Sequence, residues 1–131
     1  MSGLSELPNG VAVLGWSQEY TASHNFKTTS LTDAPSIVWD LASNQVASVT
    51  LAGNRTLANP TGMRNGGVYI LFVKQDNQGG RTLTYGSNFA WTAGNTAPTL
   101  TATPNRLDIL TFISDGSKMY GSGTFNYIPV S

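Results

Sequence analysis

The chain has 131 residues and no cysteine, so it is long enough for one compact domain and can form neither disulfides nor a thiolate metal site. Seven basic residues balance seven acidic ones without a run of either sign, so the basic stripe that a nucleic-acid binder needs is missing. Charged residues make up 11% of the chain, against about 25% in ordinary soluble domains. Two interpretations remain, a neutral stable β-domain and a component of a larger assembly. The second is favoured, because a surface poor in charge associates readily.

The beginning of the chain does not predict export or membrane insertion. It has no basic segment at its start, and Pro8, Asn9 and Gly10 interrupt its apolar residues. Nowhere does an apolar run approach the roughly 18 residues of a membrane span. We therefore expect neither a signal peptide nor a membrane as a partner.

Residues 1–35 are the least regular part of the sequence. Val11–Trp16 could form a strand, whereas Ser17–Pro35 is polar and has few apolar anchors. We predict an N-terminal arm or long loop over residues 1–35, followed by a β-sandwich module over residues 36–131.

The first strands of the module are predicted from alternation of apolar and polar residues. Ser36–Leu41 places Ile37, Trp39 and Leu41 on one face, and Val46–Leu51 alternates in the same way. A turn at Gly53-Asn54 leads into a short strand over residues 55–57. Residues 59–67, with one proline and three glycines, are predicted to form a loop.

Val68–Gln75 is the most apolar segment, and its continuous apolar run predicts burial on both faces. Asn77–Gly80 predicts a reversal, after which Arg81–Tyr85 returns as a strand. Residues 89–91 form a short apolar patch before a loop, and Thr99–Thr103 is predicted as an edge strand.

The clearest hairpin closes the module. Asp108–Ser114 is predicted to pair with Lys118–Tyr120 across Asp115-Gly116, a strong two-residue turn signal. Helical periodicity is hard to find, and no repeat of fixed 20–50-residue period is evident, which argues against a solenoid. The predicted class is all-β, an antiparallel β-sandwich or jelly-roll-like barrel with an irregular N-terminal arm.

Catalytic chemistry is not predicted. His24 is the only histidine and lies in the polar N-terminal stretch, so no histidine pair can complete a zinc site. Asp76 and Asp115 lie at strand ends, where turn formation explains them better than paired-acid hydrolysis does. No nucleophile elbow or phosphate loop occurs. We expect no enzyme, no metal and no cofactor.

Aromatic residues are the remaining functional candidates, because they can stack on sugar rings or anchor a protein interface. Trp39 and Tyr69 lie in alternating or apolar strands and are expected in the core. Trp91 lies in a loop-like patch, which favours an exposed or interfacial role. The candidate interface or recognition residues are Trp16, Trp91, Tyr85 and Tyr120.

An ordered series of short phrases resembles a β-rich module of tailed-bacteriophage virion surface proteins, of fibre-like or decoration type. The phrases span roughly residues 46–121: VTL with GNRTL, YIL leading to QD, GGRTL, F-x-W, PTL, DILTF with SDG, and YG. Met119 departs from the tryptophan expected beside the tyrosine in many relatives. The resemblance implies a non-enzymatic role in the virion, assembly in the host cytoplasm, and self-association as a homotrimer.

Two hypotheses follow for the place of the chain in the particle. Its short length suggests a complete small protein, most consistent with a capsid decoration or head-fibre protein that binds the particle surface as an oligomer. The alternative is a tail fibre or baseplate component that recognises a host-surface glycan or protein. Other virion proteins, of capsid or tail, are expected partners in either case.

Overall fold

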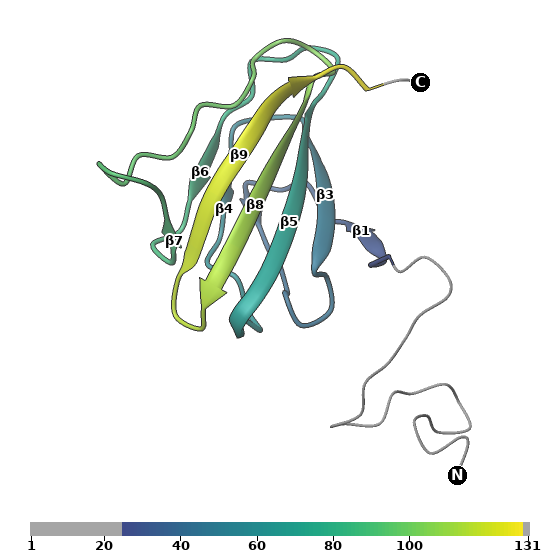
Figure 1. The fold of residues 1–131 in the computed structure, drawn as a ribbon. Helices are drawn as coiled ribbons and strands as arrows, with labels where there is room; N and C mark the ends of the chain where they lie inside the picture. Colours follow the sequence, from purple (N-terminus) through teal and green to yellow (C-terminus); the bar gives the residue numbers. More distant parts are fainter. Residues whose placement is uncertain (1–24, 130–131) are drawn as a thin grey trace, which may run out of the picture.

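The computed structural model describes residues 25–129, and the regular elements of this part of the chain are all strands (Figure 1). No helix in this range is long and apolar enough to cross a membrane. The strands are β1 (Thr28–Ser30), β2 (Ser36–Ile37), β3 (Val46–Leu51), β4 (Arg55–Leu57), β5 (Asn65–Gln75), β6 (Leu83–Tyr85), β7 (Phe89–Ala90), β8 (Leu107–Asp115) and β9 (Met119–Tyr127).

The strands form a six-stranded sheet in the order β1-β3-β5-β8-β9-β7 and a three-stranded sheet in the order β2-β4-β6. From β1 to β7 the chain alternates between the two sheets, so each strand pairs with the strand two places later or earlier rather than with its immediate neighbour in sequence. In Figure 1, β4 and β6 lie behind the layer formed by β5, β8 and β9. The two sheets enclose the core between them.

The alternation makes this part of the fold resemble a short, irregular solenoid, in contrast to the sequence expectation. β1, β3 and β5 pair in parallel, and so do β2, β4 and β6. Thr28 aligns with Val46, and Val46 with Ile70, so successive turns of the chain differ in length. Because the turns are unequal, the sequence carries no fixed period that would reveal them.

Asparagine side chains tie successive turns of the chain together. Asn54 Oδ1 accepts a hydrogen bond of 3.0 Å from the backbone N–H of Thr82. Asn59 Oδ1 accepts one of 2.8 Å from the backbone N–H of Asn88. In both bonds a side-chain oxygen accepts from a backbone N–H at a corner, where the sheet ladder ends, and so satisfies a donor that would otherwise lack a partner.

The C-terminal part of the large sheet is antiparallel, with β5, β8 and β9 side by side. The predicted hairpin is confirmed: β8 and β9 meet across Asp115-Gly116. Gly116 has φ 91°, a conformation that favours glycine, and Asp115 Oδ1 accepts 2.8 Å hydrogen bonds from the backbone N–H groups of Ser117 and Lys118. β9 continues well beyond the predicted Tyr120, to Tyr127.

The all-β prediction is confirmed, but the antiparallel pairing that accompanied it holds only for part of the large sheet. That sheet is mixed and the small sheet is parallel throughout. Arg81–Tyr85 was predicted to follow a reversal as a strand. The structure forms this strand only over β6, which pairs with β4 in the small sheet and not with β5. The predicted edge strand at Thr99–Thr103 is an irregular segment, fastened by Asp108, which accepts 2.7 and 2.8 Å hydrogen bonds from Thr101.

The described end of the predicted arm belongs to the folded module. β1 lies within residues 1–35 and is the edge strand of the large sheet. Asp33, three residues beyond β1, forms an ion pair of 2.8 Å with Arg55 at the start of β4. Val11–Trp16 and the rest of residues 1–24 lie outside the described part of the chain.

Aromatic side chains form the centre of the core. Trp39 and Phe112 are fully buried, with ring centroids 5.9 Å apart in an edge-to-face arrangement. Trp39 also packs against Tyr69 at 6.4 Å. The sequence prediction that Trp39 and Tyr69 belong to the core is confirmed.

A charged turn after β5 predicts a specific acid response. Asp76 lies 2.9 Å from the Arg81 guanidinium. The hydrogen bond from Arg81, together with those from the backbone N–H groups of Gly79 and Gln78, lowers the pKa of Asp76 from 3.8 to about 2. A carboxylate with a depressed pKa stabilises the folded state above its unfolded pKa, and this contribution disappears as pH falls through the folded value. Asp76→Asn should therefore lower the melting temperature near neutral pH, and its difference from wild type should shrink between about pH 4 and pH 2. Thermal denaturation across this range measures the difference, and a gap independent of pH would contradict the assignment.

Candidate binding pocket

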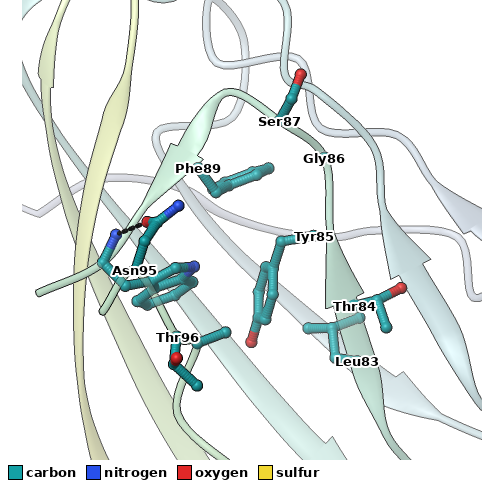
Figure 2. A pocket seen from close by; sticks show the side chains of 10 residues that line it. Leu83, Thr84, Tyr85, Gly86, Ser87, Phe89, Asn95 and Thr96 are labelled. Carbon is teal, nitrogen blue, oxygen red and sulfur yellow. Dashed lines mark hydrogen bonds between the residues drawn. The ribbon is translucent and has the colours of Figure 1, made fainter. Parts of the chain in front are cut away.

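An open cavity of about 510 Å³ lies between β6 and the segment that follows β7 (Figure 2). This volume falls within the roughly 300–1,000 Å³ typical of small-molecule sites. Two smaller cavities, of about 270 and 260 Å³, flank the same loop. The lining residues of the 510 Å³ cavity are Leu83, Thr84, Tyr85, Gly86, Ser87, Phe89, Trp91, Asn95, Thr96 and Ala97.

Aromatic rings form one wall of the cavity. The ring centroids of Tyr85 and Trp91 are 4.8 Å apart, and those of Tyr85 and Phe89 are 5.7 Å apart. Phe112, from the core, contacts both Phe89 and Trp91, at 5.3 and 5.7 Å. The wall is therefore a continuation of the core, which holds the rings in place before any ligand arrives.

A glycine in β9 provides the room for Trp91. A Cβ atom at Gly121 would lie 2.5 Å from Trp91 Cζ3 and 2.8 Å from Phe112 Cε1. Any larger residue would clash with both rings. Because Gly121 has no side chain, Trp91, the residue after β7, can pack against Phe112 in the core.

A polar loop that follows Trp91 also lines the cavity. Asn95 Oδ1 accepts a 2.9 Å hydrogen bond from the backbone N–H of Trp91, the bond drawn in Figure 2. Asn95 adopts φ 48°, and its own N–H donates to the Thr92 carbonyl at 2.7 Å, so the residue closes a tight turn. Figure 2 shows Asn95 and Thr96 across the cavity from Leu83 and Thr84.

The site carries hydroxyl and amide groups but no charged side chain among its lining residues. Burial, and to a smaller extent the charge of Asp108, raises the pKa of Tyr85 above its usual range, so the phenol stays neutral at physiological pH. Its hydroxyl is buried without a hydrogen-bond partner. At the rim, Lys118 Nζ donates a 2.8 Å hydrogen bond to the carbonyl of the lining residue Ser87.

The structure brings together two of the four candidate residues predicted from sequence. Trp91 and Tyr85 share the cavity wall, and Trp91 is half-buried. Tyr120 is 50% exposed on the large sheet, where its hydroxyl donates to Asp115 at 2.9 Å. Trp16 lies outside the described residues. Sequence analysis did not identify Asn95 and Thr96, although the Gly94-Asn95 pair is a turn signal of the kind that positions such side chains.

Within residues 25–129, no cluster of three or more His, Asp or Glu side chains could hold a metal ion. The cavity offers a ligand aromatic surface and neutral hydrogen-bonding groups. These features suit the binding of an uncharged polar molecule with an apolar face.

The fold is an all-β module, the class that the sequence resemblance implies for virion surface proteins. Residues 27–119 match the family model described as "Putative phage tail fibre C-terminal domain", and the chain belongs to this family. The match begins one residue before β1 and ends at the first residue of β9. Neither the curated proteins nor the solved structures include a match to this chain. The chain is thus a bacteriophage structural protein associated with the virion.

Proposed function

We propose that this chain is a tail-fibre domain that binds a neutral carbohydrate of the host surface in the cavity between β6 and the Trp91–Ala97 segment. The observation that carries the proposal is the uncharged lining, which combines the aromatic rings of Tyr85, Phe89 and Trp91 with the amide of Asn95 and the hydroxyl of Thr96. The C–H face of a sugar ring packs on an aromatic surface, and its hydroxyls exchange hydrogen bonds with amide and hydroxyl side chains.

The absence of charge in the lining favours a neutral sugar over an acidic one. A carboxylate or phosphate group is usually bound by arginine or lysine, whose charge-assisted hydrogen bonds offset its desolvation. Lys118 is the ammonium at the rim, and it already donates to the Ser87 carbonyl. An acidic sugar would therefore leave its charge without a matched partner inside the cavity.

The tail location rests on the family, which is described as a tail fibre domain. The head location, which the sequence analysis favoured, has no corresponding support in that description and stays a prediction. We infer a binding role without catalysis, because the family is structural and the cavity lining consists of neutral groups with no acid–base pair.

Filling the cavity should weaken carbohydrate binding. Thr96 is exposed at the cavity wall, so Thr96→Trp would occupy the volume with little effect on the core. We expect this variant to bind at least about tenfold more weakly than wild type to neutral oligosaccharides of glucose, galactose or mannose, a loss of about 1.4 kcal/mol. Isothermal titration calorimetry against each oligosaccharide measures the loss.

Thr103→Trp is the matched control, because Thr103 is also exposed but lies outside the three cavities around this loop. It should bind like wild type. Equal binding by Thr96→Trp and wild type, binding restricted to acidic oligosaccharides, or no binding of wild type to any neutral oligosaccharide tested would each contradict the proposal.

A further inference from the structure

The cavity runs along the unpaired edge of a strand. β6 pairs with β4 on one side, and no strand of residues 25–129 pairs with its other side. Successive side chains of a strand project to opposite faces of the sheet, so Leu83 and Thr84 point to different faces. Both line the cavity, as does Tyr85. The cavity therefore lies beside the free edge of β6 and not over one face of the small sheet.

The pairing with β4 determines which backbone groups of β6 face the cavity. The Thr82 carbonyl and the Gly86 N–H each form a 2.9 Å hydrogen bond with β4. Backbone groups alternate in direction along a strand, so the N–H and C=O groups of Leu83 and Tyr85 point away from β4. Among residues 25–129 these four groups have no backbone partner. A molecule bound at this edge therefore meets alternating donors and acceptors, as an added strand would.

Asn95 offers a donor across the cavity from this edge. Figure 2 shows Asn95 across from Leu83. Asn95 Oδ1 accepts from the Trp91 N–H, and a backbone N–H can bond only to the oxygen of the side-chain amide, so the orientation of that amide is fixed. The Nδ2 hydrogens are thereby left for a ligand.

A secondary amide suits both sets of groups. It is planar and trans, so its N–H and C=O point in opposite directions. Its N–H can donate to a carbonyl of the β6 edge while its own carbonyl accepts from Asn95 Nδ2. A hydroxyl group also donates and accepts, but at a single atom, so it cannot reach the two sides at once.

The aromatic rings beside this edge form a corner. The ring planes of Tyr85 and Phe89 are inclined by 61°, and those of Tyr85 and Trp91 by 64°. Rings inclined in this way enclose a small apolar group on two sides, whereas a flat sugar ring can lie against only one of them. A methyl group attached to the ligand amide would be removed from water in this corner.

We infer that the carbohydrate bound in the cavity carries an acetamido group, as an N-acetylhexosamine does. The inference rests on the proposed function and narrows its ligand to one class of neutral sugar. The acetamido N–H donates to the carbonyl of Leu83 or Tyr85, its C=O accepts from Asn95 Nδ2, and its methyl group lies in the aromatic corner. The substituent carries no charge, in keeping with the lining of the cavity.

Isothermal titration calorimetry with the full chain tests the preference. Oligosaccharides of N-acetylglucosamine or N-acetylgalactosamine should bind at least about tenfold more tightly than glucose or galactose oligosaccharides of equal length, because they add two hydrogen bonds and a buried methyl group. An analogue with an O-acetyl ester in place of the acetamido group lacks the N–H and should lose several-fold of this gain. Equal affinity for acetamido sugars and their parent hexoses would overturn the inference and leave the proposed function standing, whereas no binding of either would contradict both.

Asn95→Asp removes the donor but keeps an oxygen for the Trp91 N–H. It should reduce the preference for acetamido sugars to less than about threefold, because its carboxylate repels the ligand carbonyl. Asn105→Asp is the matched control: Asn105 has φ 61°, close to the 48° of Asn95, and lies outside the three cavities around the loop. It should keep the preference. An unchanged preference in Asn95→Asp, or an equal loss in both variants, would overturn the inference.

Amide hydrogen exchange in the ligand-free protein, followed by NMR, tests whether the edge is open. The amides of Leu83 and Tyr85 should exchange at least about tenfold faster than those of Thr84 and Gly86, which face β4. Equal protection of all four amides would mean that a segment of the same chain or of another copy already occupies the edge, and the inference would fall.

Discussion

Trp39→Ala should destabilise the domain by about 3–5 kcal/mol, the range found for deletion of large buried aromatic side chains. Trp39 has 0% exposure and contacts Tyr69 and Phe112 edge-on. Its indole Nε1–H also donates a 2.6 Å hydrogen bond to the carbonyl of Asn44, which would lose this donor. The variant therefore combines a large cavity with a lost hydrogen bond.

Urea denaturation followed by circular dichroism measures this effect. Typical domains are stable by about 5–15 kcal/mol, so the variant should retain little margin and could be unfolded at 37 °C. The neighbouring Val38→Ala is the control, since Val38 is exposed and should change stability by less than about 0.5 kcal/mol. A loss below 1 kcal/mol for Trp39→Ala would mean that the two sheets are not packed around this ring.

Gly121→Val should both destabilise the domain and eliminate the pocket. The new side chain would meet Trp91 and Phe112, whose atoms lie 2.5 and 2.8 Å from the position of a Cβ. Overpacking of this kind costs about 1–3 kcal/mol, and the least costly relief is displacement of Trp91, which faces the open cavity on its other side. We expect a lower melting temperature, altered near-ultraviolet circular dichroism from tryptophan, and loss of neutral carbohydrate binding.

Ser122→Val separates the clash from the change in strand propensity, because Ser122 is the next residue of β9 and is exposed. It should keep both the tryptophan signal and carbohydrate binding. If Gly121→Val retains the wild-type tryptophan signal and melting temperature, Trp91 does not pack against β9 as described.

The elements that sequence analysis predicted correctly depend on local chemistry. Val46–Leu51 alternates with period two and forms β3 with the predicted bounds. Asp115-Gly116 supplies a turn conformation that few other pairs adopt, and the hairpin forms around it. In both cases the signal lies within a few residues, so no knowledge of distant contacts is needed.

The pairing of strands could not be predicted in the same way. β2, β4 and β6 contain two or three residues each, too few to show a period. Their pairing partners are not adjacent in sequence, since β2 pairs with β4 and β4 with β6, and a strand of the large sheet lies between each pair along the chain. Parallel pairing requires a crossover between strands, and nothing in the sequence of either strand specifies which crossover is used. For this reason the predicted antiparallel pairing holds for β5, β8 and β9 but not for the parallel strands.

For the pocket and for the two sides of β5, the sequence likewise identified the residues but not the contacts they make. Trp91 and Tyr85 were recognisable as aromatic candidates, but their contact depends on β6 and β7 belonging to different sheets and on the space left by Gly121. The apolar run of β5 indicated burial on two sides. Only the sheet order shows that one side packs on the core, whereas Val68 on the other side is 43% exposed within the described residues.

The sequence by itself therefore determined the all-β class, the closing hairpin, the low surface charge and the resemblance to phage virion modules, because composition, short alternations and turn residues carry this information. Tertiary structure alone decided the alternation of the chain between two sheets, the contact of Tyr85 with Trp91 in one wall of the cavity, and which side of β5 packs on the core within the described residues. These features arise from contacts between residues far apart in the chain, whose free energy depends on the shape of the whole fold and not on any single segment.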